Sequence, residues 1–333
     1  MTQPRVRPPL PIYPPPQFPP RPDRAFARTP PLVFAPILGM LGLAQAMVRG
    51  LPRIEMSQAA GQLVFGLMTA LWLFAVLAYL AKAIRRPAVV AEDLETLPGM
   101  AGLATATMGM MSIAGGLDAI APGIGGAMLW PAMAAHLALV LLAGGVMMRQ
   151  PAARRQISPV HHLLFGGFVV GAIAACRLNR LALAEAVMWA MIPVAVTLWA
   201  ASLWQMRRAL PPAPLRPLLA IHLAPAGLIA NVAFQTGHVM IAQVFLGLAA
   251  AMLVVLTAWA RWVMAAPFSP LWGLMIYPLA AVIGAIFVAG GIWLPLGVGL
   301  SVLAFGAGPA LAWNVLKLWP GGRLAALTNA ARS

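Results

Sequence analysis

Residues 57–82 read SQAAGQLVFGLMTALWLFAVLAYLAK, an apolar run that carries no charge before its last residue, Lys82. A helix that crosses the hydrocarbon core of a membrane needs about 20 consecutive, mostly apolar residues. This run is long enough for one crossing, and Arg85 and Arg86 follow it within four residues. A long apolar run that ends in a short basic segment predicts a transmembrane helix whose end meets a water-facing loop.

Similar apolar runs recur along the chain and predict ten membrane-spanning helices. They cover residues 31–49, 57–82, 98–117, 123–148, 159–176, 181–206, 217–235, 238–260, 268–290 and 293–316. The runs are continuous, whereas the strands of a membrane barrel alternate apolar and polar residues over about ten positions. The sequence therefore predicts an all-α polytopic membrane protein with ten transmembrane helices arranged as five hairpins.

The composition of the whole chain favours the same fold class. Of its 333 residues, 62% are hydrophobic and 9% are charged, whereas a soluble domain has about 45–50% apolar and about 25% charged residues. So few charges exclude a soluble enzyme, and a single cysteine, Cys176, excludes a disulfide scaffold or a cysteine-based metal centre. The net charge of +15 is divided among small groups between apolar runs, whereas nucleic-acid-binding proteins gather basic residues on one face. No nucleic acid is expected as a partner.

The charges in the loops test the number of spans. With ten spans, 18 of the 22 Lys and Arg residues lie on the side of the N-terminus, and only Arg49, Arg53, Arg177 and Arg180 lie on the other side. Cytoplasmic loops carry the excess of Lys and Arg in membrane proteins. Both termini are therefore expected in the cytoplasm, and the protein is expected in the cytoplasmic (inner or plasma) membrane with the lipid bilayer as a partner.

The two ends of the chain differ from the spans. Residues 1–30 are rich in Pro and Arg and contain almost no apolar periodicity, which predicts an extended, disordered cytoplasmic tail. Within it RPPLP at 7–11 is either a ligand for a proline-binding domain or part of a solvated basic tether. Residues 31–316 form the predicted transmembrane domain, and 317–333 form a short cytoplasmic C-terminal tail.

Residues that disturb helices gather in the odd-numbered spans. Pro36, Pro225 and Pro278 lie in the first, seventh and ninth spans, and all five odd spans contain glycine. Pro131 and Pro193 lie in even spans, so the contrast is one of degree. Two interpretations stay open: close packing of helices through small residues, or an inner ring of kinked odd helices around a pathway, where freed backbone carbonyls face a cavity.

Three of the odd spans carry a family resemblance. TPPLVFAPILGMLGLAQAMVR (29–49), RPLLAIHLAPAGLIANVAF (216–234) and PFSPLWGLMIYPLAAVIGAIF (267–287) are similar to the first, seventh and ninth helices of the tellurite-resistance/dicarboxylate transporter family. Its members include bacterial tellurite-resistance proteins, fungal malate and sulfite carriers, and slow-type anion channels of plant guard cells. The resemblance covers about residues 30–320 and all ten spans.

The resemblance implies a homotrimer in which each protomer has its own pore, lined by the five odd helices and surrounded by the five even ones. It also implies that one aromatic side chain of the ninth helix closes the pore near the middle of the membrane. That position here is Tyr277, directly before Pro278, whereas the family pattern has Phe. The added hydroxyl could hydrogen-bond an anion or a water molecule in the constriction, or it could bond a backbone carbonyl of a neighbouring helix.

A few polar side chains in or near the spans are further candidates. Glu185, near the start of the sixth span, is either an interfacial partner of Arg177 and Arg180 or a proton-coupling carboxylate. His222, in the seventh span, is either a titratable donor to an anion or a neutral histidine bonded to a carbonyl. Arg177 and Arg180 are candidates for attracting anions to one mouth of the pore.

Metal and cofactor chemistry are not expected. The five histidines share no helical spacing, so we expect no metal site, and the chain has no motif that predicts a cofactor or a catalytic triad. We therefore do not expect an enzyme.

The scarcity of charge in the spans favours passive transport. A coupled transporter usually carries acids or bound ions near the middle of the membrane, and no Lys, Arg or Asp lies well inside any predicted span. The leading interpretation is a channel or facilitator for a small anion, with chloride, nitrate, a dicarboxylate, sulfite and tellurite as candidates. The alternatives are a proton-coupled exporter of an organic anion or oxyanion, and a membrane partner protein that acts through its proline-rich tail.

Overall fold

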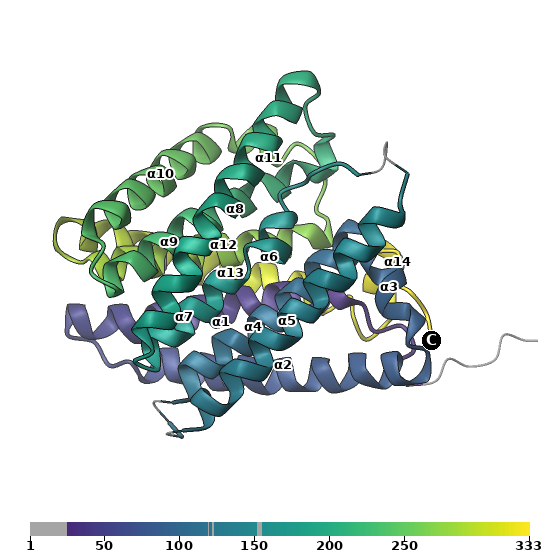
Figure 1. Cartoon of the computed structure of the whole chain (residues 1–333), viewed down its shortest axis with the longest axis horizontal. Coiled ribbons are helices and arrows are strands. Elements are labelled where there is room, and N and C mark those ends of the chain that lie inside the picture. Colours follow the sequence, from purple (N-terminus) through teal and green to yellow (C-terminus); the bar gives the residue numbers. More distant parts are fainter. Residues whose placement is uncertain (1–24, 119, 122, 152–154) are drawn as a thin grey trace, which may run out of the picture.

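The computed structural model describes residues 25–118, 120–121, 123–151 and 155–333, and the predicted tail before residue 25 lies outside this range. Every regular element in the described part is a helix, which confirms the predicted fold class (Figure 1). The α-helices are α1 (Phe34–Gly50), α2 (Ala59–Arg85), α3 (Ala88–Leu94), α4 (Leu97–Leu117), α5 (Ile124–Arg149), α6 (His161–Phe165), α7 (Phe168–Arg177), α8 (Leu181–Arg208), α9 (Leu223–Gln235), α10 (Val239–Ala258), α11 (Ala260–Val263), α12 (Ile276–Ala289), α13 (Leu294–Leu316) and α14 (Arg323–Leu327).

Nine helical segments of the described part are long and apolar enough to cross a membrane, and they coincide with nine of the ten predicted spans. The remaining span, predicted over 159–176, is broken into α6 and α7, which meet at Gly166 and Gly167. His136 of α5 packs into this break. Its Nε2 donates to the carbonyl of Leu164 at 2.9 Å, and its Nδ1 accepts from the hydroxyl of Thr107 at 2.6 Å. The imidazole thus pairs a backbone carbonyl that a continuous helix would otherwise have paired.

The spans separate into two sets by burial. We call α1, α4, α7, α9 and α12 the inner helices, and α2, α5, α8, α10 and α13 the outer helices. The long inner spans are 72–89% buried within the protein, whereas the outer spans are only 17–28% buried. In Figure 1, α2 and α10 lie at opposite edges of the bundle, with α1, α9 and α12 between them. The predicted inner ring of odd spans is therefore confirmed.

Glycines allow the inner helices to approach one another closely. A Cβ atom on Gly227 of α9 would lie 2.8 Å from the backbone of Ala281 and Val282 in α12, and one on Gly39 of α1 would lie 2.6 Å from Ile276. Backbones at this separation tolerate only glycine. Close packing through small residues and an inner ring are thus both features of the structure, not exclusive alternatives.

Three inner helices begin with 3-10 turns. Segments η1 (Pro31–Val33), η4 (Ala213–His222) and η5 (Pro270–Met275) lead directly into α1, α9 and α12. Pro36, Pro225 and Pro278 each occupy the third residue of the α-helix that follows. A proline costs no hydrogen bond in the first turn, where the N–H has no helical partner. Near each of these prolines the structure shows a change from 3-10 to α geometry, and the kinks themselves stay a prediction.

A buried ion pair joins several segments on the side of the bundle where α2 ends. Nζ of Lys82 lies 2.8 Å from Oδ2 of Asp93 in α3, and both side chains are fully buried. The same oxygen accepts from the hydroxyl of Tyr79, and Oδ1 accepts from the backbone N–H of Ala331. Lys82 also donates to the carbonyl of Thr29. The Lys82–Asp93 pair thus links α2 and α3 to segments near both described ends of the chain.

These contacts extend the packed region beyond the predicted transmembrane domain. Ala27 and Thr29, which belong to the predicted N-terminal tail, are buried. Leu324 and Ala325, in the predicted C-terminal tail, are buried in α14.

Candidate functional site

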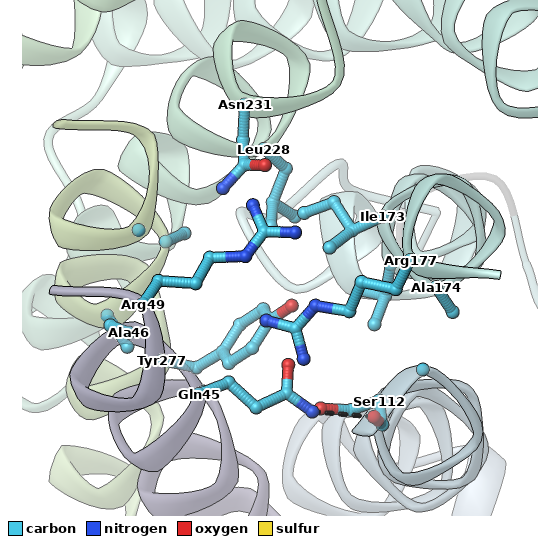
Figure 2. A pocket seen from close by; sticks show the side chains of 16 residues that line it. Gln45, Ala46, Arg49, Ser112, Ile173, Ala174, Arg177, Leu228, Asn231 and Tyr277 are labelled. Atoms are coloured by element: carbon cyan, nitrogen blue, oxygen red, sulfur yellow. Dashed lines mark hydrogen bonds between the residues drawn. The ribbon is translucent and has the colours of Figure 1, made fainter. Parts of the chain in front are cut away.

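The five inner helices enclose a cavity of about 40 Å³ (Figure 2). Every residue that lines it belongs to α1, α4, α7, α9 or α12, and each of these helices contributes at least two. By this measure a water molecule occupies about 10–15 Å³, so there is room for about three waters or one small ion. The cavity is therefore placed where a pathway between the inner helices would pass.

Tyr277 forms part of the cavity wall. It is the second residue of α12, is 5% exposed, and packs against Gly42 of α1. A Cβ on Gly42 would lie 3.0 Å from the phenol ring. The ring therefore fills the space between α1 and α12 that this glycine leaves open.

Arg49 also lines the cavity, and it is hydrogen-bonded to Gln235, which in turn bonds Asn231. Its Nη2 donates to Oε1 of Gln235 at 2.8 Å, and Nε2 of Gln235 donates to Oδ1 of Asn231 at 2.6 Å. Because Gln235 uses its oxygen for Arg49 and its nitrogen for Asn231, the chain of donors fixes the orientation of both amides. Arg49 thus has a defined position next to the cavity.

Arg177, the last residue of α7, extends into the same cavity from the opposite side, and the Tyr277 hydroxyl points toward its guanidinium in Figure 2. Its Nε is buried and has no hydrogen-bond partner in the described part of the chain. Gln45 completes the polar lining and donates from Nε2 to the carbonyl of Ser112 at 2.6 Å.

The cavity is positively charged. Among the described residues, Arg49 and Arg177 are the only ionisable groups that line it besides the Tyr277 phenol, and no carboxylate does. Two partly buried cations without an acid between them attract an anion. Within the described residues no cluster of His, Cys, Asp and Glu is suited to a metal ion.

Arg180 and Glu185 do not line this cavity. The Arg180 guanidinium stacks over the ring of Trp130 at 5.7 Å, and the residue is exposed. Glu185 of α8 accepts a hydrogen bond from Nε2 of His238, the residue directly before α10, at 2.7 Å. The interpretation that paired Glu185 with Arg177 and Arg180 is wrong, because the turn between α9 and α10 brings His238 closer.

His222 directly precedes α9, which lines the cavity, but the His222 side chain is not among the lining residues. Its Nε2 lies 3.0 Å from the hydroxyl of Ser202 in α8, and its ring packs edge-on against His162. The side chain therefore faces an outer helix instead of the cavity. One alternative in the sequence analysis bonded His222 to a backbone carbonyl, whereas in the structure its partner is the Ser202 hydroxyl.

Arg49, Gln45 and Asn231 line the cavity but were not predicted as site residues. Arg49 was expected as a loop charge, yet Arg49 and Arg177 both lie in helices and line the cavity. Both arginines lie in the last turn of their helices, so the expectation that no arginine lies well inside a span is not contradicted, but helix-end arginines also line the cavity. The available signal was spacing, since Gly42, Gln45 and Arg49 recur every three or four residues and share one face of α1.

Comparison with known proteins agrees with this architecture. No curated protein matches the chain significantly. The family model for the voltage-dependent anion channel matches residues 28–319, which include all the spans and every residue of the cavity. The chain therefore belongs to the voltage-dependent anion channel family, whose members transport anions across membranes and are not enzymes.

Proposed function

We propose that the protein is a channel or facilitator that passes small anions through a pore within each protomer, and that Tyr277 is the gate of this pore. The observation that carries the proposal is the cavity itself. Five helices from separate parts of the sequence converge on it, its described lining contains two guanidinium groups and no carboxylate, and the Tyr277 ring lies in its wall against Gly42.

Passive transport agrees better with the cavity than coupled transport does. A proton-coupled transporter needs a titratable group that faces the transported ion. Glu185 pairs with His238, and His222 faces Ser202. Neither group lines the cavity, and both were the candidates for coupling.

The gate is tested by removing the Tyr277 ring. Tyr277→Ala should raise anion flux into proteoliposomes, because it opens the space between α1 and α12, whereas Tyr277→Phe should keep flux close to the wild-type value. Flux is measured with an anion-sensitive dye in vesicles of equal protein content. Equal flux in Tyr277→Ala and wild type would remove Tyr277 as the gate.

The transported anion and the driving force are tested in the same vesicles. Chloride, nitrate, sulfite, malate and tellurite are compared with and without a pH gradient. A facilitator transports its anion down the concentration gradient at the same rate in both conditions. Transport that requires the pH gradient supports the alternative, a proton-coupled exporter of an organic anion or oxyanion.

We further propose a homotrimer in the cytoplasmic membrane with both termini in the cytoplasm. The support is the family resemblance for the trimer and the unequal distribution of Lys and Arg for the orientation. Native mass spectrometry of the purified protein tests the first, and labelling of cysteines introduced next to Arg155 and Arg53 in intact cells tests the second.

A further inference from the structure

We propose that Arg49 and Arg177 form one anion-binding site within the cavity, and that this site prefers an anion with two oxygen acceptors on one edge, such as nitrate or formate, to a halide. The inference rests on the proposed function, because it names the ion chemistry that the pathway recognises. It adds a binding site with defined residues next to the proposed gate.

The first observation is the absence of a counter-charge. The ion pairs of the described residues lie elsewhere and join Lys82 to Asp93, Arg86 to Glu92, and His238 to Glu185. Neither Arg49 nor Arg177 takes part in one. Two like charges that face the same small cavity repel each other, and burial strengthens this repulsion. An anion bound between them removes the repulsion and supplies the missing partner.

The second observation is the free edge of Arg177. A guanidinium offers Nε–H and one Nη–H as two parallel donors, and this edge matches the two oxygens of a carboxylate or similar oxyanion. In Arg177 the Nε is buried without a partner. A buried donor left unpaired is costly, so its edge favours a ligand that accepts both bonds. A halide is a single spherical acceptor and lacks the second oxygen.

The third observation is the different support of the two arginines. Arg49 is fixed through Gln235 and Asn231, whereas no described side chain accepts from Nε of Arg177. The Arg49 guanidinium therefore provides one stationary wall of the site. Arg177 provides the Nε–H and Nη–H edge, to which the two oxygens of the ligand would bond.

The size and position of the cavity agree with such a ligand. Its volume of about 40 Å³ holds about three waters, which is comparable to an ion of three or four heavy atoms. The Tyr277 hydroxyl points toward Arg177 in Figure 2, so it faces the same space. An anion at this site would contact the proposed gate directly.

The test is equilibrium binding to the purified full-length protein in detergent. Sodium nitrate, sodium formate and sodium chloride are titrated at constant ionic strength with gluconate, and the midpoint of thermal unfolding is recorded. Nitrate and formate should stabilise wild type at concentrations about tenfold below those of chloride, because they accept both guanidinium bonds.

Four variants assign the site. Arg177→Gln and Arg49→Gln should weaken nitrate binding about tenfold or more, since each removes a charged donor. Arg177→Lys keeps the charge but lacks the two-donor edge, and should lose the preference for nitrate over chloride. Arg180→Gln, three residues away and exposed, is the matched control and should bind nitrate like wild type.

The outcomes separate the inference from the proposed function. Wild-type nitrate binding in Arg177→Gln, or equal binding of nitrate and chloride to wild type, would overturn the site. Tyr277→Ala tests the gate, and it should raise flux while nitrate binding remains. Intact binding with unchanged flux in that variant would contradict the gate and leave the arginine site standing.

Discussion

Lys82 and Asp93 show how one charged pair can belong to a largely uncharged protein. Both side chains are fully buried, and Asp93 also accepts from Tyr79 and from the backbone of Ala331. The Asp93 carboxylate accepts three hydrogen bonds, from the Lys82 ammonium, the Tyr79 hydroxyl and the Ala331 N–H. These bonds offset the free energy that the two charges lose when they are removed from water. The pair therefore acts as a structural link between segments and has no contact with the cavity.

We predict that breaking this pair destabilises the protein strongly. Asp93→Asn leaves the Lys82 ammonium buried without a charged partner, which costs about 3–5 kcal/mol. The measurement is thermal unfolding of the purified variant in detergent. The double variant Lys82→Met with Asp93→Leu should unfold closer to wild type than Asp93→Asn alone, and an unfolding midpoint of Asp93→Asn equal to that of wild type would contradict the structural role.

The same residues show where sequence reasoning succeeds and fails. Asp93 falls between the predicted spans 57–82 and 98–117, where no helix is expected, yet the residue lies in α3 and is buried. Arg49 was likewise expected as a loop charge, because hydropathy averages over a window and does not show which way one side chain points. Tyr277, in contrast, was singled out through the family resemblance, and it lines the cavity.

At the scale of elements, the broken fifth span depends on the fit between Gly167 and His136. A Cβ on Gly167 would lie 2.6 Å from Nε2 of His136, the atom that bonds the Leu164 carbonyl. The end of α6 therefore has room for the imidazole only if residue 167 has no side chain. The hydrogen bond between His136 and the Leu164 carbonyl therefore depends on glycine at position 167.

We predict that Gly167→Ala destabilises the fold by about 1–3 kcal/mol, because it forces His136 away from the carbonyl it pairs. Gly145→Ala in α5 is the control, since nothing lies within 4 Å of a Cβ at that position. The control should be neutral or slightly stabilising, because alanine favours helix more than glycine does. Thermal unfolding of both variants is the measurement, and equal loss in the two would contradict the role of the break.

The order and approximate positions of nine spans could be predicted from apolar runs and loop charges, because membrane crossing depends on length and hydropathy. The break between α6 and α7 could not, since it depends on a histidine from another helix. The 3-10 starts of α1, α9 and α12 were expected only as kinks at Pro36, Pro225 and Pro278. Proline marks a local change in the helix, but its tertiary surroundings determine which change occurs.

At the scale of the whole molecule, burial alternates along the chain. Inner spans alternate with outer spans because each hairpin contributes one helix to each set, and the short turns keep the two helices of a hairpin adjacent. The outer helices carry exposed large apolar side chains, among them Leu63, Leu141, Trp204, Val254 and Trp313. Such a surface is suited to lipid or to other copies of the protein and not to water.

This alternation has a consequence for how the sequence tolerates change. In a library of single substitutions selected for function, leucine-to-isoleucine or glycine-to-alanine changes should be accepted across most of α2, α5, α8, α10 and α13, where neighbours are fluid acyl chains. The same changes should be rejected in α1, α4, α7, α9 and α12, where glycines contact other backbones. The fraction of accepted substitutions, plotted against residue number, should therefore be low in each inner helix and high in each outer helix, and so alternate five times. An equal fraction in the inner and outer helices would contradict the two-set arrangement.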